Sequence, residues 1–469
     1  MKRLDQLTFI RFIMVLLVLL YHGYGGVYDD FLNGIPFLPE LLRTAPTAVG
    51  YLYVLSGFVM ALVYYRPQEK FDILGYWKAR FVRIYPLYLI AFLLTSYYYI
   101  DGILGIKPLK VLANLFVVQA WVPRYAQSFN YASWSMTVEF FFYTIFPFFV
   151  IWAYRQPLKK LIWLSIGLWI VSQTIYQGLW IGYLDTQRNF IIYSPIFHLN
   201  SFIMGVVGGI WYLRVGKYER LNPAVIFSTL GASFLLLAGY AVVSLKYIPT
   251  LPNDLQPMAG LLAPIMIVFI VALAMDTSKL SRFLDRPWLV NLGEASYAIY
   301  ILHVPVIWLF ERYLFDSSLA FAERLFEFTV LPLMILIGLL SHFYVDIPLR
   351  RWLRNTLQRI NIPLFLLDLT IVLASIFLIF RLRFGEGREY DSYLVLIRLM
   401  FWSVFFVRTA ISIKFGVFDS AAFQLPLVQS LRPLLISTTL GSLVIAAIGY
   451  AGFAAGMYEN FPRSIYAAD

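Results

Sequence analysis

The sequence predicts an all-α polytopic integral membrane protein, a ten-span helical bundle with a re-entrant segment and about three extra C-terminal membrane helices. Of its 469 residues, 61% are hydrophobic and only 13% are charged, against about 25% charged residues in an average soluble domain. Apolar runs of about 18–25 residues recur along the chain, and each can cross a bilayer as a helix. Alternation of the kind that strands show is absent, which argues against a barrel.

The connections between the apolar runs alternate between strongly basic and weakly charged, as the positive-inside rule requires when both ends of the ten-span part are cytoplasmic. Lys2 and Arg3 precede the first run, and no small-residue cleavage site follows it, so we expect an uncleaved first span. The basic connections are 66–80, 154–160, 214–222, 276–288 and 347–362. The predicted spans are 7–26, 46–65, 81–100, 133–153, 161–180, 191–213, 223–244, 258–275, 293–314 and 323–345.

Two domains are expected, a membrane domain over residues 1–355 and an additional C-terminal transmembrane domain of unknown role over 363–469. Further apolar runs lie at 364–381, 393–413 and 432–456. The apolar segment 111–122 is too short to cross the membrane, so we interpret it as re-entrant or interfacial.

The amino-acid composition limits the classes of binding partner and of site that the chain can have. The net charge of +11 resides mainly in short loops, so no exposed basic domain is predicted that could follow a nucleic-acid backbone. Small anions and lipid phosphates are the expected partners instead. The chain has no cysteine, which removes disulfides, thiolate metal sites and cysteine nucleophiles. No metal site is predicted.

Arg11 and His22 lie eleven residues apart in the first span, in RFIMVLLVLLYH. Eleven residues make about three helical turns, so both side chains lie on one face, about 16 Å apart along the axis. Polar groups in a membrane helix are costly and mark functional paths. The alternative is that Arg11 snorkels to the inner surface and His22 lies in the interface.

Arg80 and Arg83 follow Lys78 in YWKARFVRIYPLYL, at the predicted cytoplasmic boundary of the third span. Residues three apart are neighbours on a helix, and this pair begins one. Such a cluster suits a phosphorylated ligand, through its charge and the free backbone amides of the helix end. Ordinary positive-inside anchoring explains the same residues equally simply.

Ser135, Glu139 and Tyr143 recur every four residues in WSMTVEFFFY and form a polar stripe on the fourth span. The predicted topology places Glu139 at a depth similar to that of His22. A carboxylate beside an imidazole raises its basicity and fixes its tautomer, as a general base requires. A structural partnership of Glu139 with Tyr or Asn groups is the alternative.

Ser296, Tyr300 and His303 form another polar stripe, in LGEASYAIYILH of the ninth span. These side chains are candidates for the same cavity, although hydrogen bonding between helices explains them as well. Asp346, ahead of a proline and a basic run, is interpreted as a helix terminator and anchor. Gly57 and its small neighbours predict close helix packing in the second span.

These motifs, in this order, resemble acyltransferase family 3, whose members O-acylate surface glycans and related molecules in bacteria. The resemblance covers about residues 1–355 and rests on Arg-x10-His, VLSGF, KARFVRIYPLY, WSMTVEFFFY, LGEASYAIYILH and YVDIP. It implies that Arg11 and His22 are essential for transfer, and that Arg80, Arg83 and Glu139 are the family's arginine cluster and motif glutamate. Two departures are Lys78-Ala79-Arg80 in place of a doubled arginine and Asp346-Ile347-Pro348 where the motif commonly ends in a Glu-Pro spacing. The C-terminal segment resembles the membrane domain of nucleotide-sugar dehydratases of polysaccharide assembly.

Together, residues and resemblance predict an inner-membrane O-acyltransferase of bacteria, with its N-terminus cytoplasmic. It would transfer an acyl group, expected to be acetyl, from acyl-CoA as co-substrate to a hydroxyl of a cell-surface glycan or lipid-linked saccharide. His22, oriented by Glu139, would be the general base, and a covalent acyl-histidine is a variant. The expected substrate-binding residues are Arg80, Arg83, Ser135, Tyr300 and His303, with Arg11 holding donor phosphates or the carbonyl end.

A transporter or flippase of a lipid-linked saccharide is the competing hypothesis, since intramembrane Arg, His and Glu also suit proton coupling. A scaffold for glycan synthases is a third. No bound cofactor is expected. Membrane lipids and polysaccharide-assembly proteins are the remaining predicted partners.

Overall fold

The computed structural model describes residues 4–23, 45–98, 108–182, 185–219, 221–246, 259–313 and 320–360, and, nearer the C-terminus, 368, 371–372, 403, 407–419 and 427–454. All regular secondary structure within these ranges is helical, apart from an isolated β-bridge between Ile360 and Asp419. This confirms the all-α class. Ten of the helices in the described part of the chain are long and apolar enough to cross a membrane. The protein is therefore a multi-pass membrane protein.

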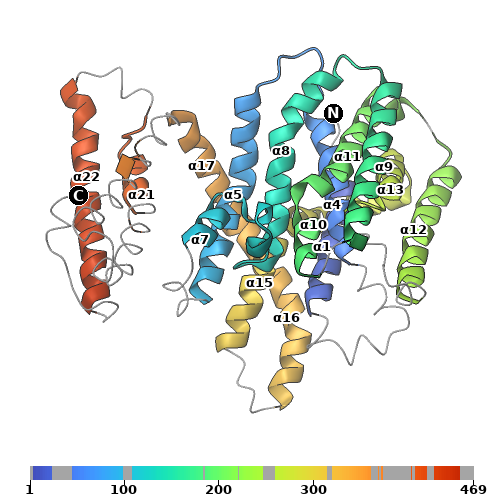
Figure 1. Ribbon diagram of the computed structural model, residues 1–469. Helices are drawn as coiled ribbons and strands as arrows, with labels where there is room; N and C mark the ends of the chain where they lie inside the picture. The colour runs from blue at the N-terminus through green and yellow to red at the C-terminus, as the bar shows by residue number, and fades with distance from the viewer. Residues whose placement is uncertain are drawn as a thin grey trace. The chain divides into compact units, whose positions relative to one another are not determined.

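The chain divides into two compact units, Met1–Pro348 and Leu349–Asp469. In the described part of the first unit, one helix corresponds to each of the ten predicted spans (Figure 1). Short helices lie between them, namely α7 (Pro108–Leu115), α10 (Asp185–Tyr193), α14 (Lys279–Leu284) and the 3₁₀ turns η1 (Gln119–Trp121), η2 (Pro123–Tyr125), η3 (Tyr131–Ser133) and η4 (Gly216–Tyr218). The helices that correspond to the spans are α1 (Asp5–Gly23), α4 (Pro46–Tyr64), α5 (Ile73–Tyr98), α8 (Trp134–Ala153), α9 (Leu158–Gly182), α11 (Pro195–Arg214), α12 (Pro223–Lys246), α13 (Ala263–Met275), α15 (Pro287–Tyr313) and α16 (Ala320–Ser341). Of these, α13 is shorter than a membrane span.

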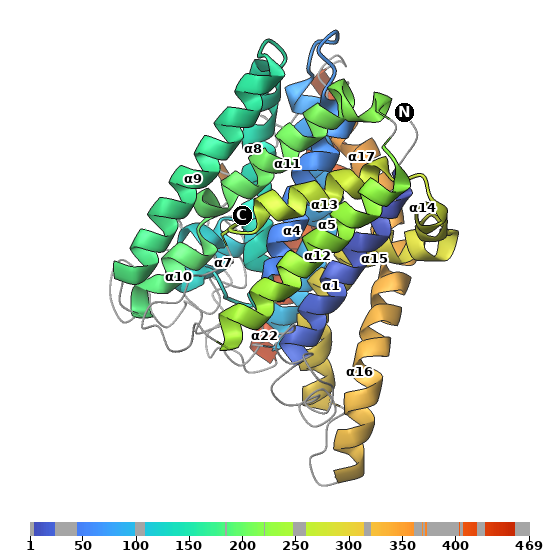
Figure 2. The same ribbon diagram turned by 90° about the vertical axis from the view of Figure 1, so that its right-hand side faces the viewer.

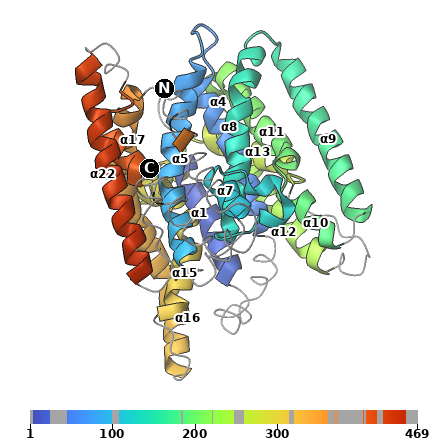
Figure 3. The ribbon, with the colours of Figure 1, turned by 60° about the vertical axis from the view of Figure 1, so that its left-hand side comes forward.

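The centre of the first unit is the pair α4 and α11. In the membrane-length segments that contain α4 and α11, 61% and 72% of the stretch is buried inside the protein. For the segments of α9 and α12 the buried share is 17% each. Figure 3 shows α9 at the edge of the unit. The contact is close because a Cβ atom at Gly57 would overlap the backbone of Phe202 and Val206, and one at Gly205 would overlap the backbone of Val54. The small residues of the second span thus let two backbones meet, as predicted.

The beginning of α1, the connection from α4 to α5 and the connection from α8 to α9 lie at one end of the unit (Figure 1). The short helix α14 lies towards the same end when the unit is turned (Figure 2). These are the segments predicted to be cytoplasmic from their lysines and arginines. The basic segments therefore share one end of the bundle.

The segment predicted not to cross, 111–122, folds into α7 and η1 between α5 and α8. Polar side chains anchor it inside the protein. The buried Gln119 amide donates to the Tyr88 hydroxyl at 3.2 Å and to the Ser133 carbonyl at 3.1 Å. The Tyr88 hydroxyl donates to the Asn114 carbonyl at 2.7 Å. These bonds satisfy backbone groups that irregular structure leaves unpaired.

Three boundaries differ from the prediction. The helix α5 begins at Ile73 rather than 81, and α13 has only 13 residues in place of a span over 258–275. Asp346 does not end a helix, because the π-helical turn η5 (His342–Asp346) runs directly into α17 (Ile347–Arg359). Pro348 is the second residue after this π-helical turn, and the chain is helical on both sides of it.

In the second unit the structure describes most of α17, and also α21 (Thr409–Lys414) and α22 (Leu427–Ala454). The latter matches the predicted run 432–456, and it is apolar and long enough to cross a membrane. Most of the predicted run 364–381 and of the run 393–413 lies outside the described residues. The predicted domain division at 355–363 stays a prediction beside the boundary at Pro348.

Candidate active site

Two imidazole rings from opposite ends of the first unit's sequence meet inside the bundle. The helices α1 and α15 pack side by side, and Nδ1 of His22 lies 2.7 Å from Nε2 of His303. The rings are nearly parallel, with an interplanar angle of 11° and centroids 5.0 Å apart. His303 is 1% exposed, and His22 is half-buried. Both residues were predicted for the site, and the structure brings them into direct contact.

The stripe of α15 continues from His303 to Tyr300 and meets the stripe of α8. The Tyr300 hydroxyl lies 2.9 Å from Oγ of Ser135 and 3.0 Å from the carbonyl oxygen of Ala132. Because Oγ of Ser135 also donates to Ala132 at 3.0 Å, these buried groups form a closed network. The two predicted residues Ser135 and Tyr300 therefore lie beside the histidine pair, and the network holds α8 and α15 in register.

Arg80 lies in a pocket of aromatic rings at the other end of this polar region. Its guanidinium carbon is 5.3, 5.9 and 5.8 Å from the ring centroids of Tyr64, Tyr76 and Tyr143. Its Nη2 donates to the Tyr64 hydroxyl at 2.8 Å. Among the described residues, the buried Nε of Arg80 has no hydrogen-bond partner. A delocalised cation between π faces is stabilised while keeping a donor for an anion.

Glu139 lies between the aromatic pocket of Arg80 and the hydrogen-bond network of Tyr300. Its carboxylate accepts a short hydrogen bond from the hydroxyl of Tyr143, one turn further along α8. It is also close enough to act electrostatically on Tyr53 and Tyr300. The hydrogen-bond partner of His22 is His303 rather than Glu139, so the predicted orientation of His22 by Glu139 is not what the hydrogen bonds show. Glu139 instead connects the arginine end with the network around Tyr300.

The remaining predicted residues lie on the same helices. Arg11 is half-buried on α1 and interacts electrostatically with Tyr51 of α4. Arg83 is exposed on α5, yet it acts electrostatically on Tyr143, as Arg80 does. The two arginines that sequence spacing made equivalent therefore differ, because one enters the aromatic pocket and the other faces outward.

Two residues beside the histidine pair, Tyr131 and Asn130, carried no signal in the sequence. The ring of Tyr131 of η3 lies perpendicular to the ring of His22, with centroids 4.9 Å apart and an angle of 89°. The preceding Asn130 donates its side-chain amide N–H to the carbonyl of Ile301 at 2.8 Å, which ties η3 to α15.

His342 and Asp346 form a buried pair within η5, with Nδ1 of His342 3.2 Å from Oδ2 of Asp346. Asp346 is thus buried and paired rather than a surface anchor.

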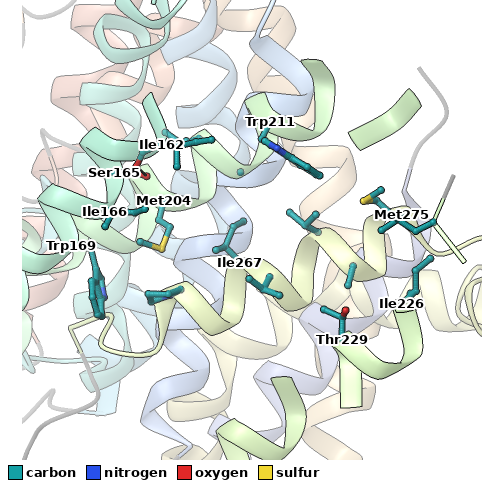
Figure 4. Close-up of a pocket in the computed structure, with 17 residues that line it drawn as sticks. Ile162, Ser165, Ile166, Trp169, Met204, Trp211, Ile226, Thr229, Ile267 and Met275 are labelled. Carbon is teal, nitrogen blue, oxygen red and sulfur yellow. Dashed lines mark hydrogen bonds between the residues drawn. The ribbon is translucent and has the colours of Figure 1, made fainter. Parts of the chain in front are cut away.

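An apolar cavity of about 610 Å³ lies away from these residues, between α9, α11, α12 and α13. Figure 4 shows Trp169 and Trp211 on its walls, with Met204 and Ile267 between them. None of the residues that line it is titratable, and none is a predicted site residue. The polar region around the two histidines, not this cavity, carries the groups that can do chemistry.

Comparison with known proteins agrees with the motifs. The model of acyltransferase family 3, an acyltransferase domain, matches residues 4–378. The chain is 26% identical over 375 residues to the acyltransferase MdmB of Streptomyces mycarofaciens, covering 75% of this chain and 92% of MdmB. It is 23% identical over 326 residues to the O-acetyltransferase OatA of Staphylococcus aureus, covering 64% of this chain and 51% of OatA.

The peptidoglycan O-acetyltransferase OatA of Listeria monocytogenes is 25% identical over 286 residues, covering 55% of this chain and 44% of that protein. The chain therefore spans nearly all of MdmB and about half of each OatA protein. No solved structure matches significantly. The multi-pass membrane fold and the family match together define a membrane enzyme of the acyltransferase class. The chain belongs to acyltransferase family 3.

Proposed function

We propose that the protein is an O-acyltransferase of a bacterial plasma membrane that moves an acyl group, expected to be acetyl, from acyl-CoA to a hydroxyl of a cell-surface glycan. The hydrogen-bonded pair of His22 and His303 inside an apolar bundle carries the proposal. Two membrane spans have no structural need to bring two imidazoles together. An imidazole is the side chain best suited to proton transfer near neutral pH.

The donor binds at the Arg80 end. The unpaired Nε of Arg80 among the described residues and the exposed Arg83 offer donors and charge for the phosphates of CoA. This end adjoins the basic connections that the charge rule assigns to the cytoplasm, where acyl-CoA is made. The groups from Arg80 through Tyr143, Glu139 and Tyr300 to the histidines give the thioester arm a polar route through the bundle.

The transfer requires one proton to move twice. His22 takes the proton of the acceptor hydroxyl while its oxygen attacks the thioester carbonyl. The carbon–sulfur bond then breaks, and the thiolate of CoA takes the proton from His22. Arg11 is assigned to stabilising the carbonyl oxygen as negative charge develops on it. A covalent acyl-histidine would divide the same transfer into two steps.

The names of the relatives support the proposed acceptor class. Two of them are named O-acetyltransferases, and the name of one specifies peptidoglycan. For this chain we propose only the chemical class of the acceptor, which is a hydroxyl of a glycan or of a lipid-linked saccharide. The unit Leu349–Asp469 holds none of the predicted site residues, and we assign it to docking of proteins that assemble the polysaccharide.

The experiment uses the purified protein in liposomes with acetyl-CoA labelled in the acetyl group. The acceptors are soluble peptidoglycan fragments and neutral oligosaccharides. Label in a base-labile ester on one acceptor, dependent on the protein, supports the proposal. A protein that consumes no acetyl-CoA but moves a fluorescent lipid-linked saccharide between leaflets is a flippase, and the proposal fails.

A further inference from the structure

The hydrogen bonds of His303 determine which of its nitrogens carries the proton. Its Nδ1 lies 2.5 Å from the backbone carbonyl oxygen of Tyr300. A carbonyl oxygen only accepts, so Nδ1 of His303 must be the donor. In a neutral imidazole the other nitrogen then carries a lone pair. Nε2 of His303 is therefore an acceptor, and it faces His22.

The bond to His303 in turn determines which nitrogen of His22 carries the proton. Its Nδ1 lies 2.7 Å from Nε2 of His303, and because that atom accepts, Nδ1 of His22 donates. The proton of a neutral His22 is thereby placed on Nδ1, and Nε2 keeps its lone pair. We infer that His303 is a positioning residue, which holds His22 in the tautomer whose Nε2 is the basic atom.

A positively charged His303 would reverse this assignment, since both of its nitrogens would then donate. The surroundings oppose such a charge. His303 is 1% exposed, and among the described residues neither His303 nor His22 forms a salt bridge with a carboxylate. The carboxylate of Glu139 is engaged by Tyr143. A buried imidazolium without a counter-ion is strongly disfavoured relative to the neutral ring.

The structure also fixes the orientation of both rings. The carbonyl of Tyr300 belongs to α15, and the hydroxyl of Tyr300 is held by Ser135 and Ala132. The ring of Tyr131 lies perpendicular to the ring of His22, and Tyr131 is attached to α15 through the bond from Asn130 to Ile301. Three elements, α1, α15 and η3, therefore leave the His22 ring little freedom to rotate. Orientation of a general base by a second group is worth a large factor in rate.

This inference rests on the proposed acyl transfer for its chemical meaning. The acceptor oxygen gives its proton to Nε2 of His22 and forms a bond to the thioester carbon. The carbon–sulfur bond breaks, and the same proton leaves Nε2 for the sulfur. His303 keeps its proton on Nδ1 throughout, exchanges none with the substrate and touches no reacting atom. Its role differs from that of a second base or a proton shuttle.

Substitutions at 303 separate these roles. The amide end of glutamine reaches about as far as Nε2 of histidine, and its oxygen can accept from Nδ1 of His22 but cannot carry a proton away. We expect His303→Gln to keep kcat within about tenfold of wild type. We expect His303→Leu to lower kcat by about 100-fold or more, with KM for acetyl-CoA unchanged. A His303→Gln variant that folds and is as inactive as His303→Leu would overturn the positioning role.

A second measurement needs no activity. The chain has four histidines, and their ring nitrogens can be labelled with ¹⁵N in the wild-type protein reconstituted in lipid. The ¹⁵N chemical shift distinguishes a protonated from a bare ring nitrogen, and His22→Gln assigns the His22 signals. We expect a protonated Nδ1 and a bare Nε2 on His22. A protonated Nε2, or a mixture of tautomers, contradicts the inference. If the tautomer is found but no acyl transfer occurs, the proposed function fails and this assignment stands.

Discussion

Arg80 shows how the surroundings of one residue define its use. Three tyrosine rings lie within 6 Å of its guanidinium carbon, and Tyr64 accepts a hydrogen bond from Nη2. Arginine suits this pocket because its flat cation stacks on rings and still presents donors at its edge. Lysine would keep the charge but lose both the stacking and the fixed donors.

We therefore predict that Arg80→Lys raises KM for acetyl-CoA by about tenfold, which corresponds to about 1.4 kcal/mol of binding free energy. The effect on kcat should be smaller, because Arg80 lies at the donor end and not beside His22. Initial rates at varied acetyl-CoA concentration provide the measurement. The exposed Lys70, on the connection before α5, supplies the control, and Lys70→Ala should leave KM unchanged. An unchanged KM in Arg80→Lys would remove Arg80 from the donor site.

The bond between Tyr143 and Glu139 predicts a loss of stability. Tyr143→Phe removes the hydroxyl that donates to the carboxylate, and a charged acceptor without its donor costs about 1.5–3 kcal/mol. Thermal denaturation in detergent should show a lower midpoint for Tyr143→Phe. Tyr218→Phe is the matched control, because Tyr218 is 72% exposed. Equal midpoints for the two variants would contradict the importance of this bond.

The sequence could predict each of these residues but not how they are paired. His22 and His303 stand out as polar residues in apolar spans, but they are 281 positions apart, and no local pattern encodes that contact. Glu139 was expected to orient His22 from its depth in the membrane. In the structure a hydroxyl one turn away competes for the carboxylate and prevails, because residues at i and i+4 meet without any tertiary constraint.

At the scale of elements, the contact of α4 with α11 determines the centre of the bundle. Glycine is required there because any side chain at 205 would overlap the backbone of Val54 and lie tightly against the backbone nitrogen of Phe58. In a membrane, helices associate through such close packing rather than through a hydrophobic driving force. The packing of α4 in turn positions Tyr64, and with it the pocket of Arg80.

Gly205→Ala should therefore destabilise the protein by about 1–3 kcal/mol, as overpacking of a core does. Gly178 of α9 provides a control, because nothing lies within 4 Å of a Cβ built there. Gly178→Ala should stabilise the helix slightly, by up to about 1 kcal/mol. Thermal midpoints measured in one detergent compare the two. Destabilisation by Gly178→Ala equal to that by Gly205→Ala would contradict the packing explanation.

Most elements could be predicted because apolar length is a local property. The differences arise where caps, turns and tertiary contacts set the ends of a helix. The helix α5 begins at Ile73 because the carboxylate of Asp72 accepts a hydrogen bond from the backbone N–H of Gly75 at 2.9 Å. Trp77, also before the predicted start, donates its indole N–H to the Tyr143 carbonyl at 3.0 Å. The helix α13 begins only at Ala263 because Gly260 adopts a positive φ of 87° before it. Neither feature follows from hydropathy.

At the scale of the whole molecule, every predicted site residue lies in the unit Met1–Pro348. The family match extends further, to residue 378. The two bounds together predict that acyl transfer does not need the chain beyond 378. The polar motifs of the first unit also explain why its site residues could be found by sequence, whereas the apolar runs of the second unit carry no comparable group of polar residues.

We expect a variant that ends at residue 378 to retain the kcat/KM of the full chain in membranes. The measurement is label transfer from acetyl-CoA at matched amounts of protein. Loss of transfer in a truncated protein that still elutes as a single species in detergent would show that the second unit contributes to catalysis. Loss of polysaccharide assembly in cells with unchanged transfer in vitro would agree with the docking role.

The most direct test of the account compares two histidine substitutions in that assay. His22→Gln keeps a side-chain donor near His303 but removes the basic nitrogen. His198→Gln changes a buried histidine of α11 whose ring bonds the carbonyl of Ile192, outside the pair. We predict that kcat/KM for acetyl transfer falls by about 100- to 10,000-fold in His22→Gln and stays close to wild type in His198→Gln. Undiminished transfer by His22→Gln would contradict the claim that His22 is the base.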